Sequence, residues 1–400
     1  MQGVDSRYAW WRLAASVTLS TLGAVGMWGV VVVFPAVQAE FQATRAEVSF
    51  AYTTTMLGFG AGSMVLGHLI DRYGAFATMV LATLLLAAGY AGGALAPNLM
   101  FFAIVQGALI GFGSAAAFIP LVADTSHWFA KRRGLAMAIC ASGNYLGGAI
   151  WPKVIDILDR QYDWRTTYFV VAAVCLTAML PTCLMLRPRL PVVKGATAAV
   201  APYSSRALGL SPNALQGWLA VAGVGCCVAM SMPQVHIVAY CVDLGYGTTR
   251  GAEMLSIMTA FGIVSRVASG WLADRVGGIK TLLLGSTLQA VALLGYLVSD
   301  TLVSLYLVSA LFGLFQGGIV PSYGVIVREY FPPKEAGARM GIAVSATIVG
   351  MALGGWMGGA LFDLTGSYHA AFINGIAWNA LNGAVVWWLL IRQNRRLVFA

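Results

Sequence analysis

Twelve apolar stretches, each about as long as a membrane-crossing helix, occupy most of this 400-residue chain. A hydrocarbon core about 30 Å thick needs about 20 apolar residues per helix, so twelve crossings use roughly 240 residues. Charged residues make up only 10% of the chain, too few to cover a water-facing surface, since soluble domains carry about 25%. The sequence therefore predicts an all-α integral membrane protein with twelve transmembrane helices, near 12–34, 50–70, 77–96, 101–123, 134–154, 166–186, 214–240, 252–272, 280–298, 303–327, 338–361 and 370–391.

The longest polar interval covers residues 187–213 and contains four prolines. It is interpreted as a cytoplasmic linker between an N-terminal six-helix half, 1–186, and a C-terminal six-helix half, 214–400. A monomer is expected, although no sequence feature reports on assembly.

The Lys and Arg residues fall mostly on one side of the predicted helices. Outer segments hold Arg45, Lys153, Arg160, Arg165 and Arg250, and Arg266 lies inside a helix, which leaves 18 of the 24 on the side of the N-terminus. Cytoplasmic segments of membrane proteins are enriched in these residues. The net charge of +9 thus reflects this one-sided distribution of basic residues. The distribution predicts a multi-pass protein of the cell (inner) membrane with both termini cytoplasmic, in contact with lipid and not with nucleic acid.

The two halves repeat a glycine-framed polar segment. Gly67, Asp71, Arg72 and Gly74 recur as Gly270, Asp274, Arg275 and Gly277, each 203 residues later, and Trp128-Phe129 recurs as Tyr330-Phe331 at an offset of 202. The glycine is expected to let helices approach closely, and the Asp and Arg to bond neighbouring helix ends as a gate. The repeat predicts two pseudo-symmetric halves that rock about a site near the midplane.

The repeated G-x-x-x-D-R-x-G segment resembles the signature loop of the major facilitator superfamily. Residues 34–52, 128–148 and 233–247 further resemble the monocarboxylate transporter family and its oxalate:formate-exchanger relatives, in their bacterial form. The resemblance implies that Arg266 holds a substrate carboxylate and that His236 lines the site. Two features of the animal members of the family are missing here. Their functional Lys in the first helix has no counterpart, and Gly262 stands where they have an Asp.

Arg266 is the most informative residue, because an ionised side chain near the bilayer centre is costly and usually faces a cavity or a partner. Its planar guanidinium suits a carboxylate bidentately. The only Asp or Glu in the predicted core of the last six helices is Glu253, near one end. We therefore expect Arg266 to bind an organic anion.

Other polar or aromatic residues could orient that anion or could equally bond one helix to another, which is the favoured interpretation for all but His236. They are His236, Tyr240, Asn144, Tyr145, Gln316, Tyr323 and Trp28. For His236 the two interpretations are evenly balanced. Lys153 is expected to extend its amine to the interface, and Asp124 to pair with Arg132 or Arg133.

The predicted function is secondary active transport of small organic anions, such as lactate or pyruvate, by alternating access with proton coupling. Because Arg does not release its proton, His236, Asp124, Glu253 or the substrate itself must carry the proton. Anion exchange needs no proton site and stays open, and drug efflux is a weaker alternative. Enzyme motifs such as H-E-x-x-H, the P-loop and G-x-S-x-G are absent from the sequence, so no catalytic residue, metal or cofactor is expected.

Overall fold

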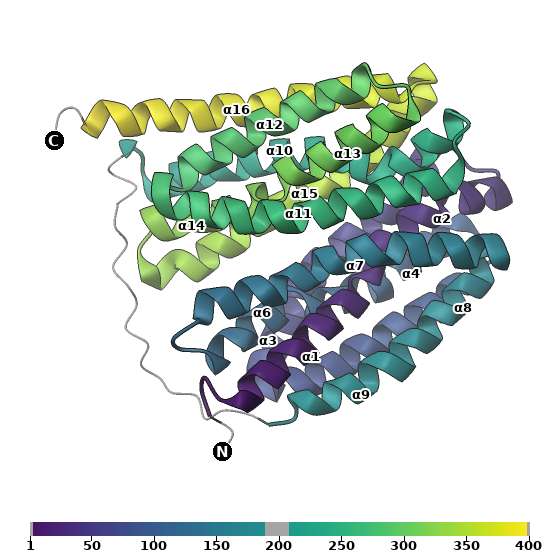
Figure 1. Cartoon of the computed structure of the whole chain (residues 1–400), viewed down its shortest axis with the longest axis horizontal. Coiled ribbons are helices and arrows are strands. Elements are labelled where there is room, and N and C mark those ends of the chain that lie inside the picture. Colours follow the sequence, from purple (N-terminus) through teal and green to yellow (C-terminus); the bar gives the residue numbers. More distant parts are fainter. Residues whose placement is uncertain (1–2, 189–207, 398–400) are drawn as a thin grey trace. The chain divides into compact units, whose positions relative to one another are not determined.

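The computed structural model describes residues 3–188 and 208–397, and no strand occurs among them. Most of the predicted linker, 187–213, therefore lies outside the described residues. Figure 1 shows the helices in chain order. The first are α1 (Arg7–Gly23), α2 (Val25–Phe41), α3 (Arg45–Ala94), α4 (Leu99–Val105), α5 (Phe112–Ser114), α6 (Ile119–Trp128), α7 (Arg133–Gln161), α8 (Trp164–Val174) and α9 (Leu180–Cys183). Short π or 3₁₀ turns, at 106–111, 115–117, 175–179 and 184–186, join or extend α4–α6 and α8–α9.

The later helices are longer and less interrupted. They are α10 (Pro212–Asp243), α11 (Gly247–Val276), α12 (Gly278–Leu297), α13 (Leu302–Gln316), α14 (Ile319–Tyr330), α15 (Pro333–Thr365) and α16 (Tyr368–Leu397).

Twelve membrane spans follow from these helices. Nine segments of the described chain are long and apolar enough to cross a bilayer. One of them, α3, is 50 residues long and breaks at Gly74, so it supplies spans 2 and 3. These nine segments therefore supply ten spans. The last two of the twelve spans are α7 and α16, whose 29 and 30 residues exceed the roughly 20 that a crossing needs. In this numbering α4–α6 form span 4, α11 is span 8, and α13 with α14 form span 10.

Local signals explain where several helices begin. Thr44 accepts from the Glu47 N–H while the Glu47 carboxylate accepts from the Thr44 N–H, which is a complete capping box for α3. At the starts of α4 and α8, the side chains of Asn98 and Asp163 each accept a hydrogen bond from the backbone N–H three residues later. Such caps satisfy N–H groups that have no partner inside the helix.

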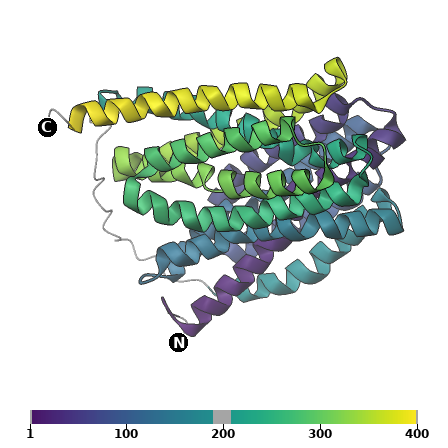
Figure 2. The same cartoon turned by 45° about the horizontal axis from the view of Figure 1, so that its top comes forward.

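The described chain divides into two compact units. The first comprises Met1–Val192 and Val235–Ala260, and the second comprises Val193–Gln234 and Phe261–Ala400. In the first unit α1 and α2 pack on α7. In the second unit α12 packs along the long α16 (Figures 1 and 2).

Close helix crossings depend on glycine in both units. A Cβ on Gly58 would overlap the carbonyl oxygen of Gly107, where span 2 crosses span 4. A Cβ on Gly317 would overlap the carbonyl oxygen of Gly262, where span 10 crosses span 8. Small residues of this kind bring helix backbones together inside a bilayer, where burial of apolar surface gives no net driving force.

Candidate functional site

Span 10 is interrupted in the second unit. Helix α13 ends at Gln316 and α14 begins at Ile319, with Gly317 and Gly318 between them. The Gly318 N–H donates to the Ser265 hydroxyl of α11 over 3.1 Å, so the break is bonded to span 8. Non-helical backbone at membrane depth occurs where it is buried in protein or lines a cavity, and interrupted spans mark substrate sites in transporters.

Arg266 follows Ser265 directly, so it lies at the level of the span 10 break. Its side chain is half-buried, and its Nε atom is excluded from solvent. In the sequence this residue is marked by its charge inside an apolar helix and by the family resemblance. The structure adds that the charge lies beside a glycine-rich interruption in the neighbouring span.

Gln316, another predicted site residue, forms a buried amide pair in the second unit. Its Oε1 accepts from the Nε2 of Gln234 on α10 over 2.9 Å, and the two side chains are 0% and 2% exposed. Gln234 was not singled out by the sequence analysis, since a single amide in an apolar helix carries no distinctive pattern. Arg266, Gln316 and Gln234 thus come from three spans around one helix break.

Tyr323 belongs to a different polar cluster of the second unit. Its hydroxyl donates to Asn382 over 3.3 Å and lies 3.5 Å from the Cys226 sulfur. Asn382 in turn donates to the Ser286 hydroxyl over 2.7 Å. These bonds join α10, α12, α14 and α16, which supports the structural interpretation for Tyr323.

Three predicted residues of the first unit form one cluster. The Trp28 indole donates to the Asn144 backbone carbonyl over 3.3 Å. The Trp28 ring meets the Tyr145 ring edge-on, with centroids 6.4 Å apart. All three side chains are buried, so the cluster joins α2 to α7.

His236 and Tyr240 are also buried in the first unit, at 2% and 5% exposure. They are four residues apart on α10, which places them on one face of the helix. The imidazole is thus held inside the bundle. Both interpretations of His236, as a structural and as a functional histidine, expect this position.

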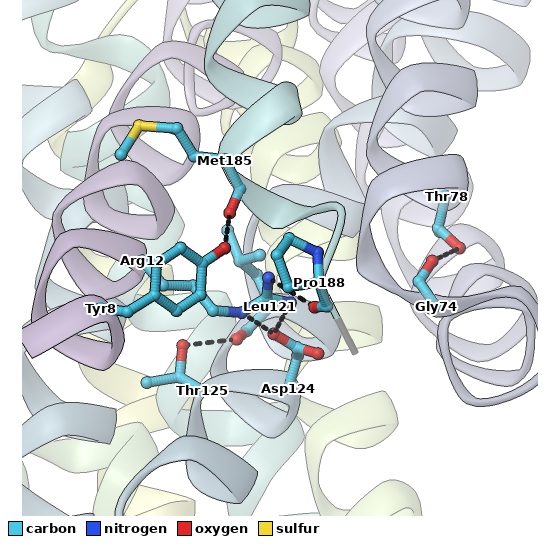
Figure 3. A network of polar contacts seen from close by, with 9 residues as sticks. All are labelled: Tyr8, Arg12, Gly74, Thr78, Leu121, Asp124, Thr125, Met185 and Pro188. Atoms are coloured by element: carbon cyan, nitrogen blue, oxygen red, sulfur yellow. Dashed lines mark hydrogen bonds and ion pairs between the residues drawn. The ribbon is translucent and has the colours of Figure 1, made fainter. Parts of the chain in front are cut away.

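Asp124 has a partner that the sequence analysis did not consider. Figure 3 shows its carboxylate on the guanidinium of Arg12, with a shortest distance of 2.8 Å. Arg12 also donates to the Pro188 carbonyl over 3.3 Å and lies 4.5 Å from the Trp128 ring centroid. This ion pair ties α1 to α6, whereas the sequence predicted a pairing with Arg132 or Arg133, of which the Arg133 side chain lies outside what the structure describes.

Glu253 also lies in an ion-pair cluster in the first unit. Its carboxylate accepts from the Lys153 amine and, over 2.9 Å, from Arg250. Lys153 was expected to extend to the membrane interface, whereas it reaches α11. The same end of the unit holds a contact of 2.6 Å between Arg45 and Asp243. Nearby, the buried Asp156 carboxylate accepts from the Thr248 and Thr249 hydroxyls.

The repeated polar segment is helical up to its last glycine. Gly74 and Gly277 have φ values of 82° and 86° and ψ values of 168° and 162°, so the two copies turn alike. The hydroxyls of Thr78 and Thr281, also 203 residues apart, donate to the carbonyls of these glycines (Figure 3 for the first copy). A positive φ favours glycine, which explains why this position repeats.

The close helix approach expected at the first glycine of this segment is not found. Among the described residues no atom lies within 4 Å of a Cβ on Gly67 or Gly270, so neither glycine is at a close crossing. Asp71 and Asp274 are exposed. The start of α12 is capped instead by Glu329, whose carboxylate accepts from the Gly278 N–H over 3.1 Å.

Twelve spans in a repeated six-helix arrangement, with an interrupted span beside a half-buried arginine, define a membrane transporter. The family model described as Major Facilitator Superfamily matches residues 17–307 and 270–398. The chain belongs to the major facilitator superfamily.

Individual relatives agree with this assignment. Monocarboxylate transporter 13 of Bos taurus is 29% identical over 342 residues, covering 84% of this chain and 78% of the relative. The agnestins efflux protein AgnL12 of Paecilomyces divaricatus is 23% identical over 85% of this chain and 78% of its own length. The solved structure of a bacterial homologue of the human lysosomal transporter Spinster matches 98% of this chain and 97% of that one, with a TM-score of 0.70 at 14% identity. That likeness supports the fold.

Proposed function

We propose that this transporter carries small organic anions, monocarboxylates such as lactate or pyruvate, by alternating access. The observation that carries the proposal is Arg266, a permanent cation in an apolar span at the level of the span 10 break. Anions suit such a position because a guanidinium binds a carboxylate through two parallel charge-assisted hydrogen bonds. The monocarboxylate transporters among the relatives support the same substrate class.

Coupling to protons is part of the proposal, and His236 is its best-supported carrier. The Asp124 and Glu253 carboxylates are both engaged in ion pairs with cations of the protein, so each already has a charged partner. His236 is buried in span 7, and histidine is the side chain whose ordinary titration falls in the physiological range.

Uptake of labelled lactate in cells expressing the wild type, Arg266→Ala or Arg392→Gln tests the substrate class. Arg392 is a matched control because it is an arginine of the same unit that donates to the Leu208 carbonyl, away from the span 10 break. We expect Arg266→Ala to reduce uptake about 100-fold, the loss of two charge-assisted bonds, and Arg392→Gln to keep it. Equal uptake by wild type and Arg266→Ala, at equal protein levels, would contradict the proposal.

Anion exchange of the oxalate:formate type is the main alternative, and efflux of larger compounds is another. A symporter accumulates lactate when only a proton gradient is imposed, whereas an exchanger requires an anion on the opposite side. Efflux predicts resistance to the exported compound in expressing cells. Proteoliposome uptake driven by an imposed pH gradient separates the first two.

The placement in the membrane is likewise proposed. The excess of Lys and Arg in segments on the side of the N-terminus supports two cytoplasmic termini. We further propose that the protein lies in the cell (inner) membrane and acts as a monomer. Cysteine labelling from either side of the membrane checks the orientation.

A further inference from the structure

The buried pair of glutamines beside the span 10 break is only half satisfied. Gln234 Nε2 donates to Gln316 Oε1, but the Gln234 Oε1 and the Gln316 Nε2 are both buried without a hydrogen-bond partner among the described residues. An amide group carries one acceptor oxygen and two N–H donors. The pair therefore holds one carbonyl oxygen and one NH₂ group that make no hydrogen bond among the described residues.

This count does not depend on how the amide atoms are assigned. Oxygen and nitrogen of a glutamine side chain are distinguished by the hydrogen-bond network. If both side chains are turned over, the bond between them reverses, and the pair again has one carbonyl oxygen and one amide nitrogen left unused. The unused pair of groups is thus a property of the two residues and their contact.

A buried polar group without a partner is costly, by about 1–3 kcal/mol each. Two such groups on neighbouring spans, 2% and 0% exposed, are therefore expected to have a partner in some state of the transport cycle. Gln316 is two residues before Gly318, which is bonded to Ser265, the neighbour of Arg266. The unused groups consequently belong to the same level of the second unit as the proposed carboxylate site.

We propose that Gln234 and Gln316 determine substrate specificity by binding a hydroxyl group on the carbon next to the substrate carboxylate. A hydroxyl can donate to the free oxygen of one glutamine and accept from the free nitrogen of the other. An oxo group can only accept, so it satisfies one of the two. An unsubstituted acid satisfies neither, and both amide groups stay unpaired.

The inference rests on the proposed function and predicts an order within it. Affinity should fall from 2-hydroxy acids to 2-oxo acids to unsubstituted acids of the same length. Lactate, pyruvate and propionate are such a series, and they share the carboxylate that Arg266 is proposed to bind. We expect lactate to bind at least about tenfold more tightly than propionate, because propionate leaves two buried groups unmet.

The test is the lactate-to-propionate ratio of dissociation constants, measured by calorimetry on the purified full-length protein. The main variant is the double replacement Gln234→Met with Gln316→Met, because replacing both partners by apolar groups of similar shape is nearly neutral for stability. We expect the double variant to bind both acids with a ratio near one, chiefly by losing affinity for lactate. Gln289→Met is the matched control, since Gln289 is a 0% exposed amide of the same unit that donates to the Cys226 carbonyl. It should keep the wild-type ratio.

The outcomes separate the two proposals. If the wild type binds both acids equally, or if the double variant keeps the wild-type ratio, the glutamine pair has no role in specificity while anion binding stands. If none of the three acids binds to a folded wild type, the proposed function fails and the inference fails with it. Melting temperatures of the same samples establish that each variant is folded.

Discussion

The crossing of spans 2 and 4 in the first unit and the crossing of spans 8 and 10 in the second use the same backbone device. Gly58 meets Gly107 at the first, and Gly317 meets Gly262 at the second, each so closely that a Cβ would overlap a carbonyl oxygen. Their side chains differ. The repeat offset of 203 places Ser63 where the second unit has Arg266, and the offset of 202 found in the fourth helix of each half places Ser114 where it has Gln316.

The two serines are satisfied within their own helices. Ser63 donates to the Phe59 carbonyl over 2.8 Å, and Ser114 donates to the Gly111 carbonyl over 2.9 Å. The Gln316 side chain bonds to Gln234 on α10, and Arg266 has a longer, charged side chain than serine. On our account the crossing of spans 2 and 4 is therefore a scaffold, and the crossing of spans 8 and 10 is a recognition site.

The largest predicted effect concerns a buried charge of the first unit, Arg12. If this unit is a scaffold, losing that charge should affect stability. Arg12→Met leaves the Asp124 carboxylate without its guanidinium, and breaking a buried pair costs about 3–5 kcal/mol. Since the Asp124 side chain is 17% exposed, we expect about 3 kcal/mol, seen as a large drop in melting temperature. Adding Asp124→Leu should recover most of it, and an unchanged melting temperature for the single variant would contradict this assignment.

Alanine at the two crossing glycines gives the next largest effect. Gly58→Ala and Gly317→Ala should each reduce the free energy of unfolding by about 1–3 kcal/mol, because the new methyl group meets backbone that cannot move easily. Only Gly317→Ala should also weaken lactate binding, since it displaces the neighbouring Gln316. Gly67→Ala is the control, as open space surrounds it. Equal losses of binding in both crossing variants would erase the proposed difference between the units.

A smaller effect is expected at the C-terminal ends of spans 4 and 10. Glu329 caps α12 through the Gly278 N–H, whereas the position 202 residues earlier is His127. Glu329→Gln keeps the acceptor oxygen and removes the charge, so it should cost at most about 1 kcal/mol through the helix dipole. His127→Gln should cost less. Thermal unfolding of both variants measures these two losses of stability. A greater loss for His127→Gln than for Glu329→Gln would contradict the prediction.

The smallest effects are predicted for the serines at the first crossing. Ser63→Ala and Ser114→Ala remove hydroxyls bonded only to carbonyls of their own helices. Changes away from packed or charged features usually stay within about 0.5 kcal/mol, and uptake of labelled lactate should not change. A tenfold loss of uptake in either variant would show that the first crossing also takes part in recognition.

The sequence was sufficient for the spans, because a span depends on composition along one helix. It also marked Arg266 as a charge inside such a helix, and the substrate role of Arg266 stays a prediction. The repeat predicted two equivalent segments, and the structure adds that both turn alike at Gly74 and Gly277. The partners of polar residues were harder to predict, since Arg12 and Asp124 are 112 residues apart and Gln234 and Gln316 are 82 apart. Gly67 was expected at a close crossing, but the crossings use Gly58 and Gly317, which no motif marks. Packing between helices decided these cases, and a one-dimensional pattern does not contain it.

The central claim is that Arg266 binds the carboxylate of the substrate. Calorimetric titration of lactate into purified wild type and Arg266→Gln tests it most directly, because binding is measured without transport or coupling. The account predicts that the dissociation constant rises about 100-fold or more in the folded variant, as expected for losing a charge-assisted bidentate contact. A dissociation constant within twofold of the wild type would contradict it.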